Sequence, residues 1–168
     1  MKKIISILSC SLIFSFTSLY AEVDGFKDLK FGMNTDEVSK IMKRECNKVG
    51  DFQYKYIGGK ECYTLMGEKR KLSAFFEGNE LVEIRLLEFE EILHSTMENL
   101  AKGLKKKYKL YNETFENSTN FLYLAFEGGQ IAYTANPDYG ATLRYMEKKR
   151  AKEFLTENGL LKSDDSDF

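Results

Sequence analysis

The chain has 168 residues, 43% of them hydrophobic and 30% charged, and its formal net charge at pH 7 is −1. This length suits one domain with a hydrophobic core of its own. The balanced charge argues against a nucleic-acid binder, which needs a surplus of Lys and Arg to displace counterions, and against electrostatic docking on a membrane.

Residues 1–21 have the three parts of a secretory signal peptide. Lys2 and Lys3 give a positive start, positions 4–19 form an apolar run, and Ala21 precedes the polar chain. The run is too short and wrongly flanked for a stable membrane span. We therefore predict cleavage after Ala21, no integral membrane span afterwards, and a periplasmic or secreted location. The alternative is a retained N-terminal anchor.

The three cysteines fall on both sides of this cleavage site. Cys10 lies inside the apolar run, whereas a lipoprotein signal would place a cysteine at its end, so we expect no lipidation there. Cleavage leaves Cys46 and Cys62, and two cysteines in an exported chain most often form a disulfide. Such a disulfide would stabilise the fold by about 3 kcal/mol on the chain-entropy model.

A short extended segment at 26–31 leads into the first predicted helix. Asn34 is a good N-cap, and Glu37 three residues later completes a capping box. Apolar residues then recur at helical spacing as far as Cys46, which predicts one buried stripe. The stripe consists of Val38, Ile41, Met42 and Cys46.

Four strands are predicted next, in two hairpins. Gly58-Gly59 is the expected turn of the first hairpin, and Gly78-Asn79 is that of the second. The predicted strands are 52–57, 62–66, 71–77 and 80–89.

The second half begins with an amphipathic helix predicted at 90–108, whose C-terminal end is crowded with lysines. Those lysines suit the helix dipole, and an anion or lipid-headgroup patch is the alternative. A polar loop is expected at 112–120 and a disordered acidic tail at 161–168. The other predicted elements are strands 121–127, 130–135 and 141–146, and a closing helix at 147–158.

This order of elements predicts an α+β fold in which helices pack on one face of an antiparallel sheet, in a single domain at 22–160. Phe76-Glu77-Gly78 is echoed by Phe126-Glu127-Gly128 at a second hairpin. The echo suggests a pseudo-repeat of 26–89 and 90–147. A chance match is the alternative, because every tight hairpin favours Gly.

Leu29-Lys30-Phe31-Gly32-Met33-Asn34, with Val38 four residues on, carries a resemblance. It resembles the opening of small exported helix-plus-sheet domains, such as the outer-membrane assembly lipoprotein family once called small protein A. The tandem fold of beta-lactamase-inhibitor-like proteins is similar. The resemblance implies a binding or scaffolding module rather than an enzyme, and it implies no functional residue.

Little in the chain points to catalysis. His94 is the single histidine, and with two paired cysteines it cannot assemble a usual zinc site. We expect no metal and no cofactor, and we interpret the acids Glu88, Glu90 and Glu91 as the charged start of the second helix.

The most plausible functional surface is aromatic. Phe52, Tyr54 and Tyr56 form a column on one strand face, and Tyr63 is expected across the hairpin. These rings either belong to the core or line an exposed sheet face that binds a protein, peptide or glycan. Tyr133, Tyr139 and Tyr145 pose the same choice in the second half.

Arg85 and Arg144 are expected to project from strands on the sheet face opposite the helices, where they could recognise carboxylates. We therefore predict a non-catalytic binding module of the bacterial envelope, whose partner is another protein, a peptide or an envelope component. The alternative is an exported hydrolase or inhibitor-type factor that acts on cell-wall or host proteins.

Overall fold

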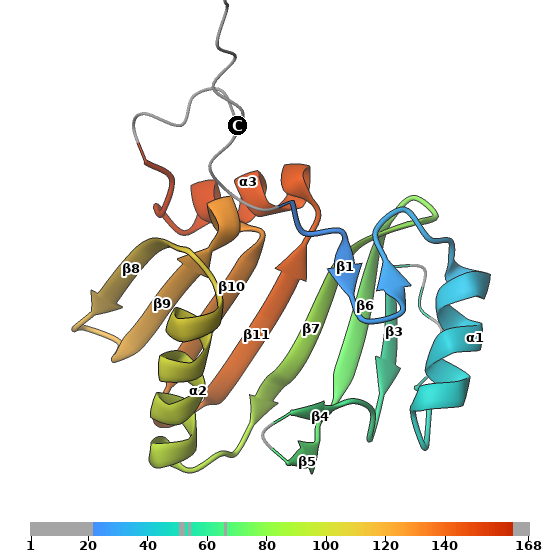
Figure 1. Ribbon diagram of the computed structural model, residues 1–168, viewed down its shortest axis with the longest axis horizontal. Coiled ribbons are helices and arrows are strands. Elements are labelled where there is room, and N and C mark those ends of the chain that lie inside the picture. The colour runs from blue at the N-terminus through green and yellow to red at the C-terminus, as the bar shows by residue number, and fades with distance from the viewer. Residues whose placement is uncertain (1–21, 51–52, 54, 66, 163–168) are drawn as a thin grey trace, which may run out of the picture.

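The computed structural model describes residues 22–50, 53, 55–65 and 67–162 (Figure 1). The predicted signal peptide lies outside these residues. So do Phe52 and Tyr54 of the predicted aromatic column, and positions 163–168 of the predicted tail.

A seven-stranded antiparallel sheet forms the centre of the fold, in the order β3-β6-β7-β11-β10-β9-β8. The predicted α+β class with an antiparallel sheet is confirmed. The strands of this sheet are β3 (Tyr56–Gly59), β6 (Leu72–Glu77), β7 (Glu80–Glu90), β8 (Leu110–Glu116), β9 (Phe121–Phe126), β10 (Ile131–Asn136) and β11 (Gly140–Met146). Two small hairpins accompany it: β1 (Gly25–Phe26) with β2 (Leu29–Lys30), and β4 (Thr64–Leu65) with β5 (Glu68–Lys69).

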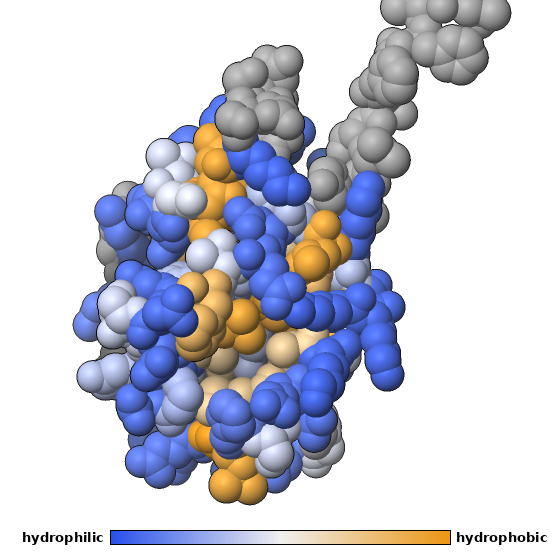
Figure 2. All heavy atoms as spheres, turned by 90° about the vertical axis from the view of Figure 1, so that its left-hand side faces the viewer, coloured by the Kyte–Doolittle hydropathy of each residue, from blue (hydrophilic) through white to orange (hydrophobic). Residues whose placement is uncertain are grey.

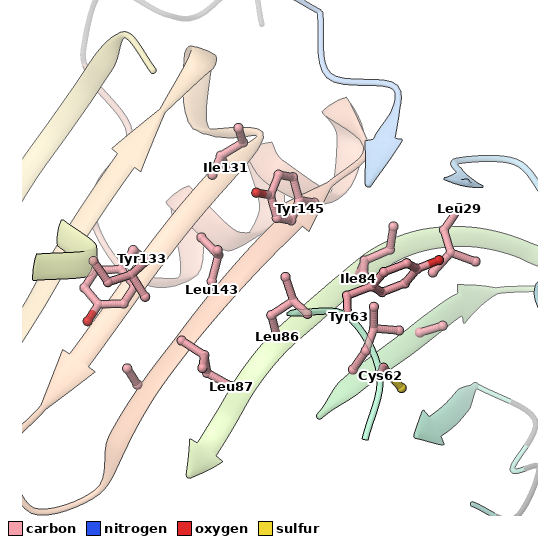
Figure 3. Packing of buried hydrophobic residues seen from close by; sticks show 14 of the residues in the cluster. Leu29, Cys62, Tyr63, Ile84, Leu86, Leu87, Ile131, Tyr133, Leu143 and Tyr145 are labelled. Carbon is pink, nitrogen blue, oxygen red and sulfur yellow. The ribbon is translucent and has the colours of Figure 1, made fainter. Parts of the chain in front are cut away.

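Helices cover both faces of the sheet. Helices α1 (Thr35–Glu45) and α2 (His94–Lys107) pack in the larger hydrophobic cluster, which also holds Leu86, Leu143 and Tyr145 of the sheet (Figure 3). Helix α3 (Lys148–Glu157) packs on the opposite face, against a second cluster. The expectation that all helices share one face thus holds for α1 and α2 but not for α3. Ala125 and Ala132 point to that opposite face, and their small side chains leave room for a helix.

The two long helices start differently. At α1 the predicted capping box is present, with the Asn34 side chain accepting from the backbone N–H of Glu37 and the Glu37 side chain accepting from that of Asn34. Helix α2 starts four residues later than predicted and has no acid in its first turn. The reason is that Glu90 ends β7 instead, where its carboxylate accepts from the backbone N–H of Lys71 at 3.2 Å.

The Cys46–Cys62 disulfide is present, as predicted, and it explains an error in the first hairpin. Gly58 and Gly59 do not form a turn but lie within β3, paired with Ser73 and Leu72 of β6. A Cβ atom on Gly59 would lie 2.3 Å from the Cys62 Sγ, so Gly is needed here for close approach to the disulfide rather than for a turn. Of the predicted return strand at 62–66, Thr64–Leu65 is a strand, but it pairs with β5 rather than with β3.

The predicted polar loop at 112–120 is also wrong over its first half. Residues 110–116 form β8, which pairs with β9 on the outer side of the sheet. Tyr111 is the one fully buried residue of this strand. An edge strand that buries so little lacks the apolar alternation by which strands are recognised. The second hairpin at Gly78-Asn79 and the closing helix are confirmed.

Candidate functional site

Three of the predicted site residues lie on one face of the sheet. Tyr56, Arg85 and Arg144 are all on the face opposite α1 and α2, since their neighbours Ile57, Ile84 and Tyr145 point into the larger cluster. We call this surface the arginine face. It consists of Tyr56, Ser73, Phe75, Glu83, Arg85, Glu88 and Arg144.

Tyr63 lies away from the arginine face. Its side chain is only 7% exposed and packs edge-on against Phe26, with ring centroids 5.4 Å apart. Burial raises the pKa of the Tyr63 hydroxyl to about 12. Figure 3 shows the ring beside Ile84, and both residues belong to the larger cluster. The structure therefore separates Tyr63 from the other described candidates.

Glu83 occupies the centre of the arginine face, although it is only 1% exposed. Its carboxylate accepts from Arg85 Nε at 2.5 Å, from Arg144 Nη1 at 2.7 Å and from Arg150 Nε at 3.2 Å. These three arginines come from β7, β11 and α3. A single carboxylate thus joins the two central strands of the sheet and the helix behind them.

The electrostatics of this cluster favour the charged form of Glu83. Burial acts to raise the pKa of Glu83, but the hydrogen bond from Arg85 and the charges of Arg144, Arg85 and Arg150 outweigh it and hold the pKa below its usual value. Burial lowers the pKa of Arg144, and the charge of Glu83 opposes that effect. Arg85 and Arg144 thus bind a carboxylate of their own chain, Glu83, and the recognition of a partner's carboxylate stays a prediction.

The aromatic part of the arginine face adjoins this cluster. The Arg85 guanidinium lies 3.8 Å from the centroid of the Phe75 ring, and the Tyr56 and Phe75 rings are 5.1 Å apart. Beneath them the Ser73 hydroxyl donates to Glu88 at 2.5 Å and accepts from the Tyr56 hydroxyl at 3.2 Å. Such stacking restricts the orientation of the guanidinium.

Sequence reasoning missed several residues of this surface. Glu83, Ser73, Phe75 and Arg150 were not among the predicted site residues. Ser73 and Phe75 could have been found from the Gly78-Asn79 hairpin, which pairs Ser73 with Arg85 and Phe75 with Glu83. Arg150 could not, because nothing in the sequence places α3 on that face.

His94 begins α2 and lines an open hollow of about 260 Å³. We call this cavity the α2 hollow. It is lined by His94, Met97, Glu98, Phe115, Asn120, Leu122, Ala135, Asn136 and Pro137. The imidazole Nε2 lies 3.3 Å from Glu98, and that is the one carboxylate among the lining residues. Nowhere in the described ranges do three or more His, Cys, Asp or Glu side chains gather as they would to hold a metal ion.

The tyrosines of the second half divide between core and surface. Tyr133 and Tyr145 are buried in the larger cluster, and the Tyr133 hydroxyl donates to the carbonyl of Met97 on α2 at 3.1 Å. Tyr139 is 65% exposed and stacks on Phe121. Only Tyr139 among these three is therefore available to a partner.

Comparison of the chain with protein-family models, curated proteins and solved structures found no match. The resemblance to small protein A and to the beta-lactamase-inhibitor-like tandem fold therefore stays a prediction. None of the helices in the described part of the chain has the length and apolarity needed to cross a membrane. The disulfide is compatible with an extracellular location, because disulfides persist in oxidising compartments.

Proposed function

We propose that the protein is a non-catalytic binding module of the bacterial envelope, periplasmic or secreted, which binds another protein or a peptide through the arginine face. One observation supports this most. The apolar side of α3 packs with Ala125, Ala132 and Met146 of β9, β10 and β11. Its recorded side-chain contacts with β6 and β7 come from Lys149 on Glu77 and Arg150 on Glu83, at the start of the helix. The half-buried side chains of Tyr56, Phe75 and Arg85 lie on the part of the sheet that the apolar side of α3 leaves open.

The chemistry of these side chains suits a protein partner. Aromatic residues and Arg are enriched at the centres of protein interfaces, where they contribute most of the binding free energy. The Arg85 guanidinium is already ordered by Phe75 and Glu83, so binding would cost it little conformational entropy. A partner that places an apolar or aromatic group on the Tyr56 and Phe75 rings fits this surface best, because Arg85 is already paired with Glu83 and Glu88.

The alternative of an exported hydrolase or inhibitor-type factor stays a prediction. A hydrolase would need His94 as its catalytic base, and Glu98 is the single carboxylate that lines the α2 hollow beside it. A general base and acid need convergent groups, and the arginine face offers none that is free of its ion pairs.

A pull-down from an envelope extract of the host tests the proposal. The bait is the chain from Glu22 onward, compared with a Tyr56→Ala/Phe75→Ala double variant. We expect recovery of the specific partner to fall at least tenfold in the double variant. A Tyr139→Ala variant, which removes an exposed ring elsewhere, should recover the partner like the unchanged chain. Unchanged recovery by a folded double variant would contradict the proposal.

A further inference from the structure

The two edges of the sheet are protected differently. At one edge, the segment before β3 folds back over it: Val49 bridges to Gly59, Gly50 N–H donates to the Gly58 carbonyl, and Lys60 N–H donates to the Lys48 carbonyl at 2.8 Å. At the other edge, β8 pairs with β9 on one side, and no strand of the described chain pairs with its outer side. Exposed edges present a row of unpaired backbone groups that can accept another strand.

Part of β8 is shaped to accept such a strand. A bulge between Leu110 and Asn112 interrupts the start of β8. From Asn112 to Glu116 the register with β9 is regular and includes no proline. Within this regular run no bulge, proline or lysine blocks pairing, and its two charged residues are Glu113, which pairs with Lys105, and Glu116.

The α2 hollow lies at the end of this regular run. Its walls are mainly apolar and include Met97 of α2, Phe115 of β8 and Leu122 of β9. Pockets for drug-sized ligands usually measure about 300–1,000 Å³. The hollow, at about 260 Å³, is smaller and suits one large apolar side chain.

Three of the four large hydrophobic residues that stay exposed in the described chain lie in or next to the residues that line this hollow. Large hydrophobic side chains that stay exposed in the described chain are Leu93 at 76%, Tyr139 at 65%, Phe115 at 54% and Leu110 at 41%. Phe115 lines the hollow, Leu93 precedes its His94, and Tyr139 follows its Pro137 by two residues. Figure 2 shows this side of the molecule, with apolar atoms in a recess between hydrophilic side chains. Such a patch marks a contact site more often than chance exposure.

The opposite end of β8 is basic. The last turn of α2 carries Lys105, Lys106 and Lys107, all exposed, and Lys109 follows directly before β8. Lys105 pairs with Glu113 of β8 at 2.6 Å, whereas Lys106 has no ion pair among the described residues. A binding strip therefore runs along β8 from a lysine-rich end to an apolar hollow.

We propose that β8 and the α2 hollow form a second binding site, distinct from the arginine face, for an extended segment of a partner polypeptide. The segment adds to the edge as an eighth strand and places one large apolar side chain in the hollow. Acidic residues of the segment lie beside the lysines at the other end. The lysines adjoin Leu110 at the start of β8, and the hollow adjoins Phe115. Because paired strands have about the same rise per residue, the acidic and apolar positions of the added strand are separated by roughly five residues. Backbone hydrogen bonds give affinity, and the hollow gives specificity, as in other complexes formed by strand addition.

Selection from a phage-displayed library of random twelve-residue peptides tests this site, with the chain from Glu22 onward as the target. We expect the enriched peptides to share one aromatic or large aliphatic residue and an acidic group about five positions away. Hydrogen exchange on the complex should show slowed exchange for amides within 112–116. This measurement needs no variant and reports strand addition directly.

Matched variants locate the bound peptide. Phe115→Asp should weaken peptide binding at least tenfold, and Lys105→Gln/Lys106→Gln should weaken it about threefold and reduce its salt dependence. Phe75→Asp, on the arginine face, should leave peptide affinity unchanged. Thermal melting checks that each variant is folded. We expect Phe115→Asp to fold, because Phe115 is half-exposed.

Several outcomes would overturn the assignment. They are the absence of any enriched peptide, binding that Phe75→Asp abolishes and Phe115→Asp does not, and bound peptides that leave the amides of 112–116 unprotected. A concentration-dependent dimer that Phe115→Asp dissociates would assign the edge to a second copy of the chain. At least tenfold tighter peptide binding by a chain ending at Lys162 would assign it to residues 163–168. A fall in partner recovery by the Tyr56→Ala/Phe75→Ala variant in the pull-down tests the arginine face and does not test this site.

Discussion

The two halves of the sheet are built alike on one face and differently on the other. Helices α1 and α2 lie on the same face, one over each half (Figure 1), and the last strand of each half, β7 or β11, pairs with the other at the centre. On the opposite face, the apolar side of α3 covers the second half, and its Lys149 and Arg150 side chains reach Glu77 and Glu83 of the first. Small or apolar residues such as Ala132 and Met146 lie under α3, whereas Ser73 and Arg85 occupy the open half. The residues on a sheet face thus reflect what covers it.

Glu83 lies between the half of this face that α3 covers and the open half, and its removal is expected to have the largest effect. Glu83→Ala would leave three arginines around an empty position, including the largely buried Arg144. Removing one partner of a buried ion pair lowers the free energy of unfolding by about 3–5 kcal/mol, because the other charge stays buried without compensation. We expect urea unfolding to show a loss of this size.

Glu77→Ala is the control for this experiment, because Glu77 is an exposed partner of Lys149 at 2.7 Å. Exposed ion pairs contribute little, so this change should leave the unfolding free energy almost unaltered. Equal effects of the two substitutions would show that the arginine cluster does not hold the halves together.

The disulfide stabilises only the first half, so its removal tests whether the halves unfold together. Cys46→Ser/Cys62→Ser should lower the unfolding free energy by about 3 kcal/mol, the value expected for a closed loop of this order. A single cooperative transition should persist in both fluorescence and circular dichroism. Two separated transitions would show that the second half is stable without the first.

Acid should lower the stability of the fold through Glu83, at the centre of the arginine face. The pKa of Glu83 is lowered in the folded state from its ordinary value of 4.5, so its stabilising effect is complete above that pH. The effect is lost as the pH falls through the folded pKa, because protons then bind more readily to the unfolded chain. The loss should be smaller than that from Glu83→Ala, since a protonated carboxyl still accepts hydrogen bonds.

The measurement is the unfolding free energy in urea from pH 7 to pH 3, for the unchanged chain and for Glu83→Gln. The curve of the variant should be shallower below pH 4.5. Parallel curves would assign the acid sensitivity to other carboxylates.

The helix starts provide the smallest test. Asn34→Ala should destabilise the chain by about 1 kcal/mol, because the side chain accepts from two backbone N–H groups of α1. Leu93 precedes α2 without a capping hydrogen bond, so Leu93→Asp should stabilise by up to about 1 kcal/mol. Thermal melts would show shifts of opposite sign, and shifts of the same sign would contradict the comparison of the two helices.

Local chemistry made much of the fold predictable. The capping box at Asn34, the Gly78-Asn79 turn and the paired cysteines each depend on residues close in sequence or on a simple count. The errors arose where tertiary contacts decide. Gly59 is needed for the disulfide rather than for a turn, and β8 buries too little to show an apolar alternation.

The candidate site was predictable only in part for the same reason. The alternation of β7 was enough to place Arg85 opposite the helices. The central role of Glu83 depends on Arg150, which reaches it across 67 positions of sequence. The pseudo-repeat stays a prediction. The repeated Phe-Glu-Gly sequence makes the β6–β7 turn correspond to the β9–β10 turn, so that β6 corresponds to β9. In the sheet, by contrast, β7 and β11 are the central pair, and β6 and β10 occupy equivalent places beside them.

One hydrogen-bonded contact near the N-terminus also bears on how the chain folds. The Gln130 side-chain amide donates to the carbonyl of Val23 at 3.1 Å and accepts from its N–H at 3.4 Å, across 107 positions. Phe26 then packs on both Tyr63 and Tyr145, one from each half. Contacts of such high sequence separation slow folding, because a long loop must close before they form. The first residues of the domain can therefore be locked in place only after its last strands have been synthesised.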